Sequence, residues 1–250
     1  MEKNILTEDI IQYKNFITKE EAEACIKVLN IKMEKKHLMW HDISFYESFS
    51  SGFPEPGDPD LNLVGLPEDF FINLEKRFRD VTADLAKKNP NQMDKIGYHT
   101  QKWEPGAYAS YHSDNSSNDG ESSAFERSRY ATFLYLNDDY DGGLINFKAN
   151  HGESFISIKP EIGMLMTFHG GAKNLHEVTL VKKSPRYTIG SFWDDRKEED
   201  YPEDLRNAWK IEMAETRKMQ GEQYERWREI KQSGKRLSPR GEMVDEKDLL

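Results

Sequence analysis

The sequence predicts a mainly β protein, a jelly roll or barrel with flanking helices, and two features carry this prediction. From about Lys95 to Trp193, short β-rich segments alternate with turn signals such as Asp141-Gly142-Gly143. On both sides of this region, apolar residues recur at helical spacing instead. About eight short strands at such regular spacing are typical of a jelly roll or barrel, and 250 residues suffice for one large domain.

The N-terminal part, residues 1–94, is expected to form a strand and supporting helices that pack on the core. Residues 10–16 are predicted as a short strand, and Thr18-Lys-Glu-Glu21 is a capping box that starts a helix. A second helix is expected from about Glu68 to Lys88, with its apolar residues along one stripe. Residues 46–66 between the helices are rich in Ser, Gly and Pro, which indicates a loop.

The β-rich part, residues 95–195, is predicted to be the core domain. Its strands are expected near residues 95–103, 107–112, 130–136, 144–148, 154–158, 163–168, 176–182 and 186–193. Residues 196–232 then follow as a heavily charged helix with a thin apolar stripe that includes Trp209 and Trp227. The last residues, 233–250, are polar and charged and are expected to be a disordered tail.

Composition limits the cellular context and the partners. The net charge is −10, and an acidic chain is a poor match for the phosphate backbone of nucleic acids. The lone cysteine, Cys25, lies on a helical apolar stripe, where a buried thiol is expected, and it suits a reducing compartment. No apolar run resembles a signal peptide or a membrane span. We therefore expect a cytoplasmic protein without nucleic-acid or membrane partners.

A candidate metal site begins at Tyr111-His112-Ser113-Asp114. Residues two apart in a strand face the same side, so His112 and Asp114 can point at one metal ion. Two histidines and one carboxylate on one face of an iron leave coordination positions open for other ligands. A later strand must supply the second histidine, and both His169 and His176 are candidates. We favour His176, because two glycines after His169 mark a turn.

An arginine completes the set of candidate residues. Arg186 lies on the strand that follows His176, and its guanidinium can hold a carboxylate through a bidentate, charge-assisted pair. Each of these residues is unremarkable alone. Their order within one β-rich region points to an iron site next to a binding site for a dicarboxylate.

With these motifs, residues 95–195 resemble the catalytic domain of the prolyl-hydroxylase branch of the Fe(II)- and 2-oxoglutarate-dependent oxygenases. The motifs in chain order are Trp103-Glu-Pro-Gly106, His112-Ser-Asp114, Tyr135-Leu-Asn137, Gly142-Gly143, Pro160-Glu-Ile-Gly163, His176-Glu-Val178 and Arg186. The resemblance implies a double-stranded β-helix (jelly roll) fold. Arginine at position 186, where collagen-type members commonly use lysine, is closer to the oxygen-sensing and ribosomal-type prolyl hydroxylases.

The resemblance also implies a set of ligands and residue roles. His112, Asp114 and His176 are expected to bind Fe(II), while Arg186 and Tyr135 bind the 5-carboxylate of the cosubstrate 2-oxoglutarate. O₂ is the second cosubstrate, and ascorbate is expected to stimulate the reaction. The reaction hydroxylates a substrate and releases succinate and CO₂.

The substrate is expected to be a prolyl residue in a protein or peptide. Trp103, Tyr108 and Tyr111 are expected to line its pocket, and the polar segments 46–66 and 115–128 to cover it. The sequence departs from the family pattern here, since Trp103 replaces a frequent tyrosine and an alanine precedes His112 by three residues. Three alternatives remain: a hydroxylase of a free amino acid or other small molecule, a nucleic-acid oxygenase, disfavoured by the acidic charge, and a non-catalytic jelly-roll binding module. The intact ligand set argues against the last of these.

Overall fold

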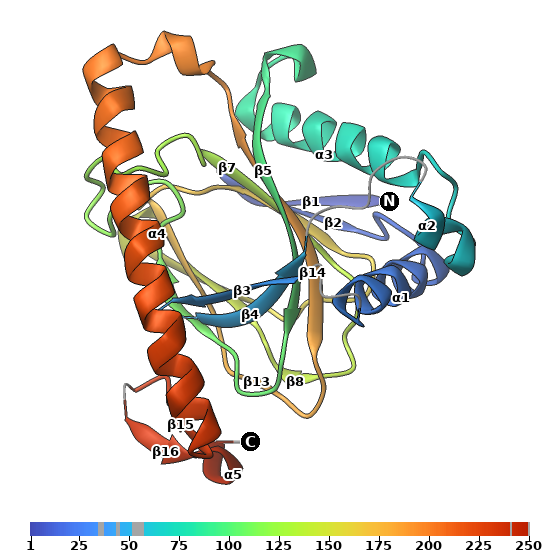
Figure 1. Ribbon diagram of the computed structural model, residues 1–250. Coiled ribbons are helices and arrows are strands. Elements are labelled where there is room, and N and C mark those ends of the chain that lie inside the picture. Colours follow the sequence, from blue (N-terminus) through green and yellow to red (C-terminus); the bar gives the residue numbers. More distant parts are fainter. Residues whose placement is uncertain (35–37, 44–45, 52–57, 241, 250) are drawn as a thin grey trace.

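A curved antiparallel sheet dominates the molecule, and it forms the jelly roll that the sequence predicts (Figure 1). The computed structural model describes residues 1–34, 38–43, 46–51, 58–240 and 242–249. Its large sheet runs in the order β1-β2-β11-β7-β14-β5-β4-β6-β12-β9-β10, with β3 beside β4. The strands from β1 to β4 in this order form a larger set, and β6-β12-β9-β10 form a smaller one. The two sets are joined where Tyr46 of β4 pairs with Ala109 of β6.

The strand boundaries agree closely with those expected for residues 95–195. The strands of the large sheet are β1 (Glu2–Thr7), β2 (Ile10–Lys14), β3 (Leu38–Ile43), β4 (Tyr46–Ser51), β5 (Asp94–Trp103), β6 (Ala109–His112), β7 (Tyr130–Tyr135), β9 (Ile145–Ala149), β10 (Ser154–Ile158), β11 (Leu165–His169), β12 (Asn174–Val178) and β14 (Arg186–Asp194). Two small hairpin sheets join β8 (Asp141–Gly142) to β13 (Val181–Lys182) and β15 (Lys235–Leu237) to β16 (Met243–Asp245).

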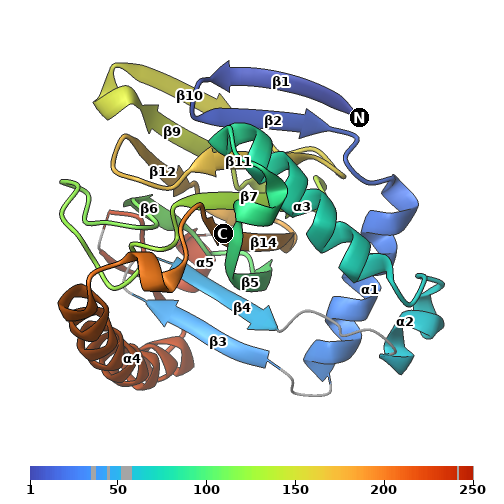
Figure 2. The ribbon, with the colours of Figure 1, turned by 90° about the horizontal axis from the view of Figure 1, so that it is seen from above.

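Helices lie on opposite sides of the barrel (Figure 2). On one side are α1 (Lys19–Glu34), α2 (Pro59–Val64) and α3 (Phe70–Ala86), and on the other is the long α4 (Glu203–Gln232), with the short α5 (Glu246–Leu249) at the C-terminal end. Single 3₁₀ turns occupy Pro90–Gln92, Asn150–Gly152 and Glu198–Asp200. The predicted capping box starts α1, because the Glu21 amide donates to Thr18 Oγ1 (3.1 Å) and the Thr18 amide donates to Glu21 Oε2 (2.8 Å).

Strand β7 shows how the sheet separates two cores. Its residues alternate between faces, so Tyr130 and Leu134 pack under α1 and α3 while Ala131 and Tyr135 point into the barrel. Thr132 also faces the helices, where its hydroxyl lies 2.7 Å from that of Thr82 in α3. The core under the helices therefore stabilises the sheet from outside, so the barrel interior is free to hold a functional site.

Two predictions for the connecting segments are wrong. Residues 46–66 are not one loop, because they include β4 and α2; residues 52–57 lie outside the described part of the chain. The expected disordered tail, 233–250, contains β15, β16 and α5, and its buried Arg236 forms an ion pair with the partly exposed Glu246 (2.7 Å). Neither segment has a strong periodicity, so its structure depends on contacts with the rest of the molecule. None of the described helices combines the length and apolar character that a membrane span requires.

Candidate metal centre and cosubstrate pocket

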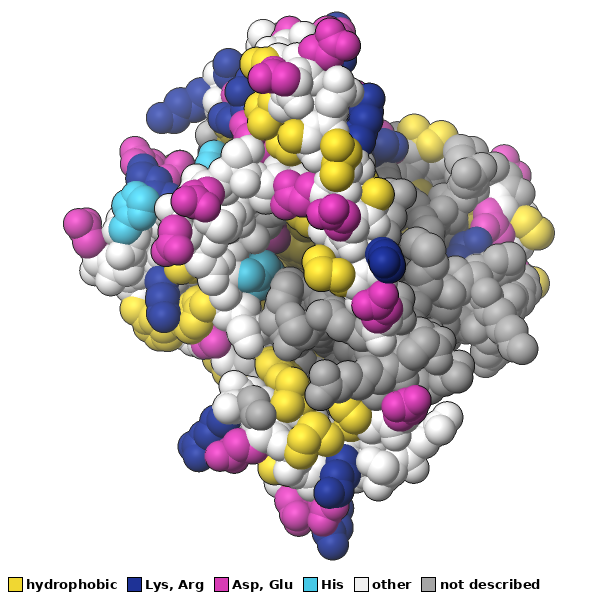
Figure 3. All heavy atoms as spheres, turned by 60° about the vertical axis from the view of Figure 1, so that its left-hand side comes forward, with side chains coloured by type: hydrophobic (Ala, Val, Ile, Leu, Met, Phe, Trp, Pro, Cys, Tyr) yellow, Lys and Arg dark blue, Asp and Glu magenta, His cyan; other side chains and the backbone are white. Residues whose placement is uncertain are grey.

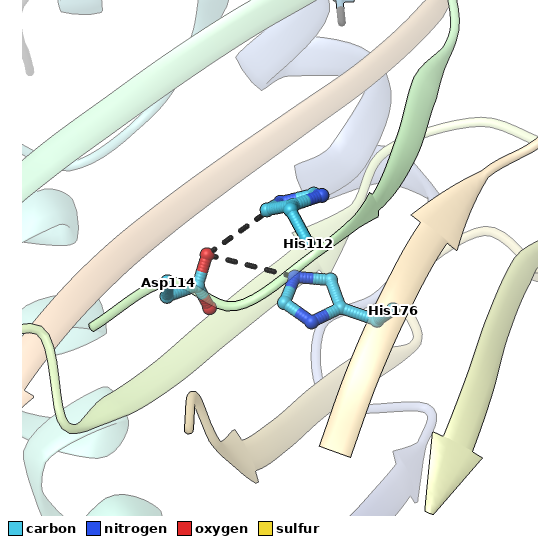
Figure 4. Close-up of side chains that lie close together, drawn as sticks. All are labelled: His112, Asp114 and His176. Carbon is cyan, nitrogen blue, oxygen red and sulfur yellow. Dashed lines mark ion pairs between the residues drawn. The ribbon is translucent and has the colours of Figure 1, made fainter. Parts of the chain in front are cut away.

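Two neighbouring strands and the loop after one of them bring His112, Asp114 and His176 together (Figure 4). His112 ends β6 and stands directly opposite His176 in β12. Their Nε2 atoms lie 3.7 Å and 3.5 Å from the same oxygen, Oδ1 of Asp114. One potential ligand atom from each residue lies within 4.8 Å of the other two, which is the spacing of donors around a single metal ion.

Backbone carbonyls fix the protonation of both imidazoles. His112 Nδ1 lies 2.7 Å from the Ser110 carbonyl and His176 Nδ1 lies 3.2 Å from the Asn174 carbonyl. Because a carbonyl only accepts hydrogen bonds, each Nδ1 carries a proton, which leaves Nε2, the nitrogen nearer Asp114, as the atom that could bind a metal. Burial, with the nearby His176, lowers the pKa of His112 to about 4, so its imidazole is neutral and able to bind a metal at neutral pH.

The surroundings of Asp114 also fit a metal ion. Its other carboxylate oxygen, Oδ2, is buried and has no hydrogen-bond partner among the described residues. A buried carboxylate oxygen without a donor is costly, and a cation removes that cost. The Asp114 amide donates to the Gly170 carbonyl (2.7 Å), as does the Ser113 hydroxyl (2.9 Å), so the turn after β11 holds the carboxylate in place.

The competing histidine, His169, points away from this site. It follows Phe168 in β11, and Phe168 faces the barrel interior, where its ring centroid lies 4.7 Å from that of His176. His169 therefore projects to the other face, against the ring of Tyr130, and its Nδ1 accepts a hydrogen bond from the Gly171 amide (3.2 Å). Burial lowers the pKa of His169, so this imidazole is an uncharged packing group.

Arg186 lies inside the barrel beside Tyr135, and one nitrogen of its guanidinium lacks a partner among the described residues. It is buried at the start of β14, and its Nε has no hydrogen-bond partner among the residues described. The guanidinium carbon lies 5.0 Å from the ring centroid of Tyr135 and 5.3 Å from that of Trp103. A buried arginine in this state fits a carboxylate ligand, since charge-assisted pairing offsets the cost of desolvation.

Tyr140 also belongs to this pocket, although no pattern in the sequence pointed to it. Its hydroxyl is buried without a partner among the described residues, and burial raises its pKa while the charge of Arg186 opposes that rise. Gly143 makes this packing possible: a Cβ there would lie 2.7 Å from the Tyr140 ring and 3.1 Å from Arg186 Cδ. The Gly142-Gly143 pair in the sequence indicates a place where a side chain would not fit. Only the fold shows that Tyr140 and Arg186 occupy the space beside Gly143.

The three aromatic residues expected around the substrate do not lie together. Trp103 packs near Arg186, at the cosubstrate end of the barrel. Tyr108 is buried, and its hydroxyl donates to the Ser238 carbonyl (3.1 Å) in the C-terminal segment.

Tyr111 is on the outer face of the sheet. It precedes His112 in β6 and therefore faces the other way, under the ammonium group of Lys148, which lies 4.0 Å from its ring centroid. Burial, with Glu177 nearby, raises the pKa of Tyr111 to about 12. The expectation that Tyr111 lines the pocket is wrong, because strand alternation assigns it and His112 to opposite faces.

Residues 115–128 are held against the body of the protein rather than standing free as a cover. Ala124 is buried against Tyr201 and Trp209, and Arg127 donates to the buried carboxylate of Asp194 (3.2 Å). The face that carries α4 is hollowed, with hydrophobic side chains and a histidine at the rim of the hollow (Figure 3).

Fold and site together define a class: a jelly roll that carries the 2-His-1-carboxylate set of non-haem iron oxygenases. Residues 98–194 match the model of the 2OG-Fe(II) oxygenase superfamily. The match includes His112, Asp114, His176 and Arg186. The superfamily uses Fe(II), 2-oxoglutarate and O₂, as the sequence analysis expected, and the His-Asp-His group is present here.

Curated relatives and solved structures agree with this assignment. Over 61 residues, 24% of this chain, the sequence is 36% identical to prolyl 3-hydroxylase 2 of Mus musculus and of Homo sapiens, and the aligned part spans 9% of either relative's length. A prolyl-4-hydroxylase from Pseudomonas putida has a TM-score of 0.58 at 17% identity, with 76% of this chain and 94% of that one covered.

Two further structures share the fold. A prolyl hydroxylase from Trichoplax adhaerens, in complex with a peptide fragment of the oxygen degradation domain of hypoxia inducible factor, has a TM-score of 0.57 at 17% identity, covering 81% and 87% of the two chains. The viral collagen prolyl hydroxylase of Paramecium Bursaria Chlorella virus-1, in its 2-oxoglutarate complex, has a TM-score of 0.53 at 17% identity, covering 75% and 96%. At these identities the likeness establishes the fold.

Proposed function

We propose that this chain is an Fe(II)- and 2-oxoglutarate-dependent dioxygenase that hydroxylates prolyl residues in a protein or peptide. One observation carries the proposal: the His-Asp-His group and a buried arginine that forms no ion pair with a described residue face the interior of the same barrel. The first fits Fe(II) and the second fits the distal carboxylate of a 2-oxo diacid.

Each residue has a distinct role in this proposal. His112, Asp114 and His176 would hold Fe(II) through two imidazoles and one carboxylate, which leaves positions free for other ligands. Arg186 and Tyr135 bind the 5-carboxylate, and Tyr140 is placed to donate its hydroxyl to the same group. With the cofactor and cosubstrates bound, oxidative decarboxylation of 2-oxoglutarate by O₂ yields succinate and CO₂ and transfers one oxygen atom to the substrate.

The prolyl part of the proposal is supported by likeness to other proteins. The curated relatives are prolyl 3-hydroxylases, and three solved structures with the same fold are prolyl hydroxylases, one of them in complex with a peptide. The hollow beside α4 fits a substrate, such as a peptide, of which only one residue enters the protein. A free amino acid or other small molecule is the alternative substrate, and the cytoplasmic location stays a prediction of the sequence.

A peptide hydroxylation assay tests the proposal. The full chain is incubated with Fe(II), ascorbate, 2-oxoglutarate and O₂, with either a panel of proline-containing peptides or free proline. We expect succinate release and a gain of one oxygen atom on a peptide proline, detected by mass spectrometry. His176→Ala should lose both signals because it removes a ligand, whereas His169→Ala, altered on the opposite face of β11, should retain them.

The outcomes separate the two levels of the proposal. Hydroxylation of free proline alone would contradict the peptide substrate but leave the dioxygenase intact. Activity that survives His176→Ala and disappears in His169→Ala would overturn the assignment of the metal ligands.

A further inference from the structure

One aromatic side chain stands out inside the barrel. Every residue of β7 is buried except Phe133, which is partly exposed. Phe133 lies two residues before Tyr135 and so projects into the barrel interior, where it packs beside the inner core. A partly exposed ring that points inward borders an open space within the barrel.

The strand opposite Phe133 has no side chain at the matching position. Gly190 in β14 pairs with Phe133, and a Cβ at Gly190 would lie 2.4 Å and 2.5 Å from two carbons of the Phe133 ring. Real Cβ atoms do not approach other atoms this closely. Gly190 has no left-handed backbone conformation, so the space for the ring is what the glycine provides. Phe133 and Gly190 are therefore a matched large and small pair.

The pair lies between the two ends of the cosubstrate pocket. One step along the ladder toward Arg186, Thr188 pairs with Tyr135. On the other side, the Phe133 ring stacks on Phe168 with centroids 6.2 Å apart, and the Phe168 ring contacts that of His176. Phe133 therefore lies next to Tyr135, which neighbours Arg186, on one side and next to Phe168, which neighbours His176, on the other.

We propose that Phe133 and Gly190 together form the wall that sets which 2-oxo diacid the pocket accepts. The inference rests on the proposed function. The Phe133 ring lies over Gly190 and narrows the space beside the chain of the diacid. Replacing the ring by a smaller side chain widens that space, whereas a side chain at Gly190 pushes the ring toward the diacid.

The test measures binding and needs no turnover. The full chain loaded with Mn(II) is titrated by calorimetry with 2-oxoglutarate and with 2-oxoadipate, which is longer by one methylene. Enzyme pockets distinguish one methylene by about 10- to 200-fold. We expect the wild type to prefer 2-oxoglutarate within that range and Phe133→Leu to reduce the preference at least about tenfold.

Variants of the glycine test the steric pairing. Gly190→Ala should weaken binding of 2-oxoglutarate, and Phe133→Leu combined with Gly190→Ala should restore it, because the smaller side chain leaves room for the methyl group. Gly97→Ala is the matched control: Gly97 lies in the neighbouring strand β5, and a Cβ there meets no atom within 4 Å. Its ratio of affinities should equal that of the wild type. If Gly190→Ala alone does not fold, recovery in the double variant still supports the pairing.

Failure of this inference is distinguishable from failure of the proposed function. An unchanged ratio of affinities in Phe133→Leu, with both diacids bound, overturns the inference alone. Absence of 2-oxoglutarate binding in the wild type overturns the proposed function as well. A double variant as weak as Gly190→Ala would contradict the steric pairing.

Discussion

At the scale of single residues, the site depends on which face of a strand each side chain occupies. His112 and His176 face the barrel interior, whereas their neighbours Tyr111 and Glu177 interact on the outer face. Arg186 and Tyr135 likewise come from inward positions of β14 and β7. Because successive strand residues face opposite sides of the sheet, one residue belongs to the buried site while its neighbour in the sequence lies on the outer surface.

Arg186→Ala should weaken 2-oxoglutarate binding about 10- to 100-fold, because hydrogen bonds to charged groups contribute about 1.5–3 kcal/mol. Arg186→Lys should retain part of the affinity, since it keeps the charge but loses the planar fork. Titration of the Mn(II)-loaded protein measures both. Mn(II) affinity without 2-oxoglutarate is the control and should not change, because Arg186 does not belong to the metal-ligand group. Equal 2-oxoglutarate affinity in Arg186→Ala would remove this residue from the pocket.

At the scale of elements, α4 supports the segment that follows the candidate metal ligand Asp114. Trp209 and Tyr201 bury Ala124, and the Tyr201 hydroxyl donates to Asp194 (2.8 Å), which also binds Arg127. Figure 1 shows α4 running along the outside of the barrel, where it contacts β3. The charged helix that the sequence predicted is therefore part of the body of the protein.

Trp209→Ala should loosen residues 115–128 without unfolding the barrel. Truncating a buried tryptophan costs about 3–5 kcal/mol in well-packed sites, and here the loss falls on the contact between α4 and this segment. Hydrogen exchange should become faster in residues 115–128 and stay unchanged in β7. Met219→Ala, at an exposed position of the same helix, is the matched control and should leave both regions as they are. Equal protection of 115–128 in Trp209→Ala would contradict this role of α4.

At the scale of the whole molecule, the barrel concentrates unsatisfied polar groups that a metal and a diacid would satisfy. Asp114 Oδ2, Arg186 Nε and the Tyr140 hydroxyl are all buried without partners among the described residues. Each such group lowers the stability of the protein on its own. Ligands that pair with these groups bind the folded state alone and should stabilise it.

Mn(II) and 2-oxoglutarate together should therefore raise the melting temperature. A ligand at 100 times its Kd adds about 2.7 kcal/mol to the free energy of unfolding. For a chain of this size that corresponds to a rise of about 5–10 °C, measurable by thermal shift. His112→Ala should abolish the rise due to Mn(II), and chelation with EDTA should reverse it in the wild type. A melting temperature insensitive to both ligands would contradict binding within the barrel.

The sequence by itself predicted the positions of the strands within residues 95–195, the helices α1, α3 and α4, and the candidate residues of the site. Strong local signals explain this success: β-rich segments between turn residues, the capping box at Thr18, and residue types that bind metals or carboxylates. Each of these signals spans only a few residues, so it can be recognised without knowledge of the fold. The structure groups His176, and not His169, with His112 and Asp114, because the side chain of His169 lies on the opposite face of β11.

Only the tertiary structure decided which side chains meet. The roles of Tyr140 and of the pair Phe133 and Gly190 depend on strand register between segments about 50 residues apart, which no local pattern encodes. The order of the C-terminal segment likewise follows from contacts such as that between Tyr108 and Ser238. The periodicity of apolar residues shows which face of a helix or strand is buried. It does not show which other element packs on that face, because this depends on the free energy of the whole fold.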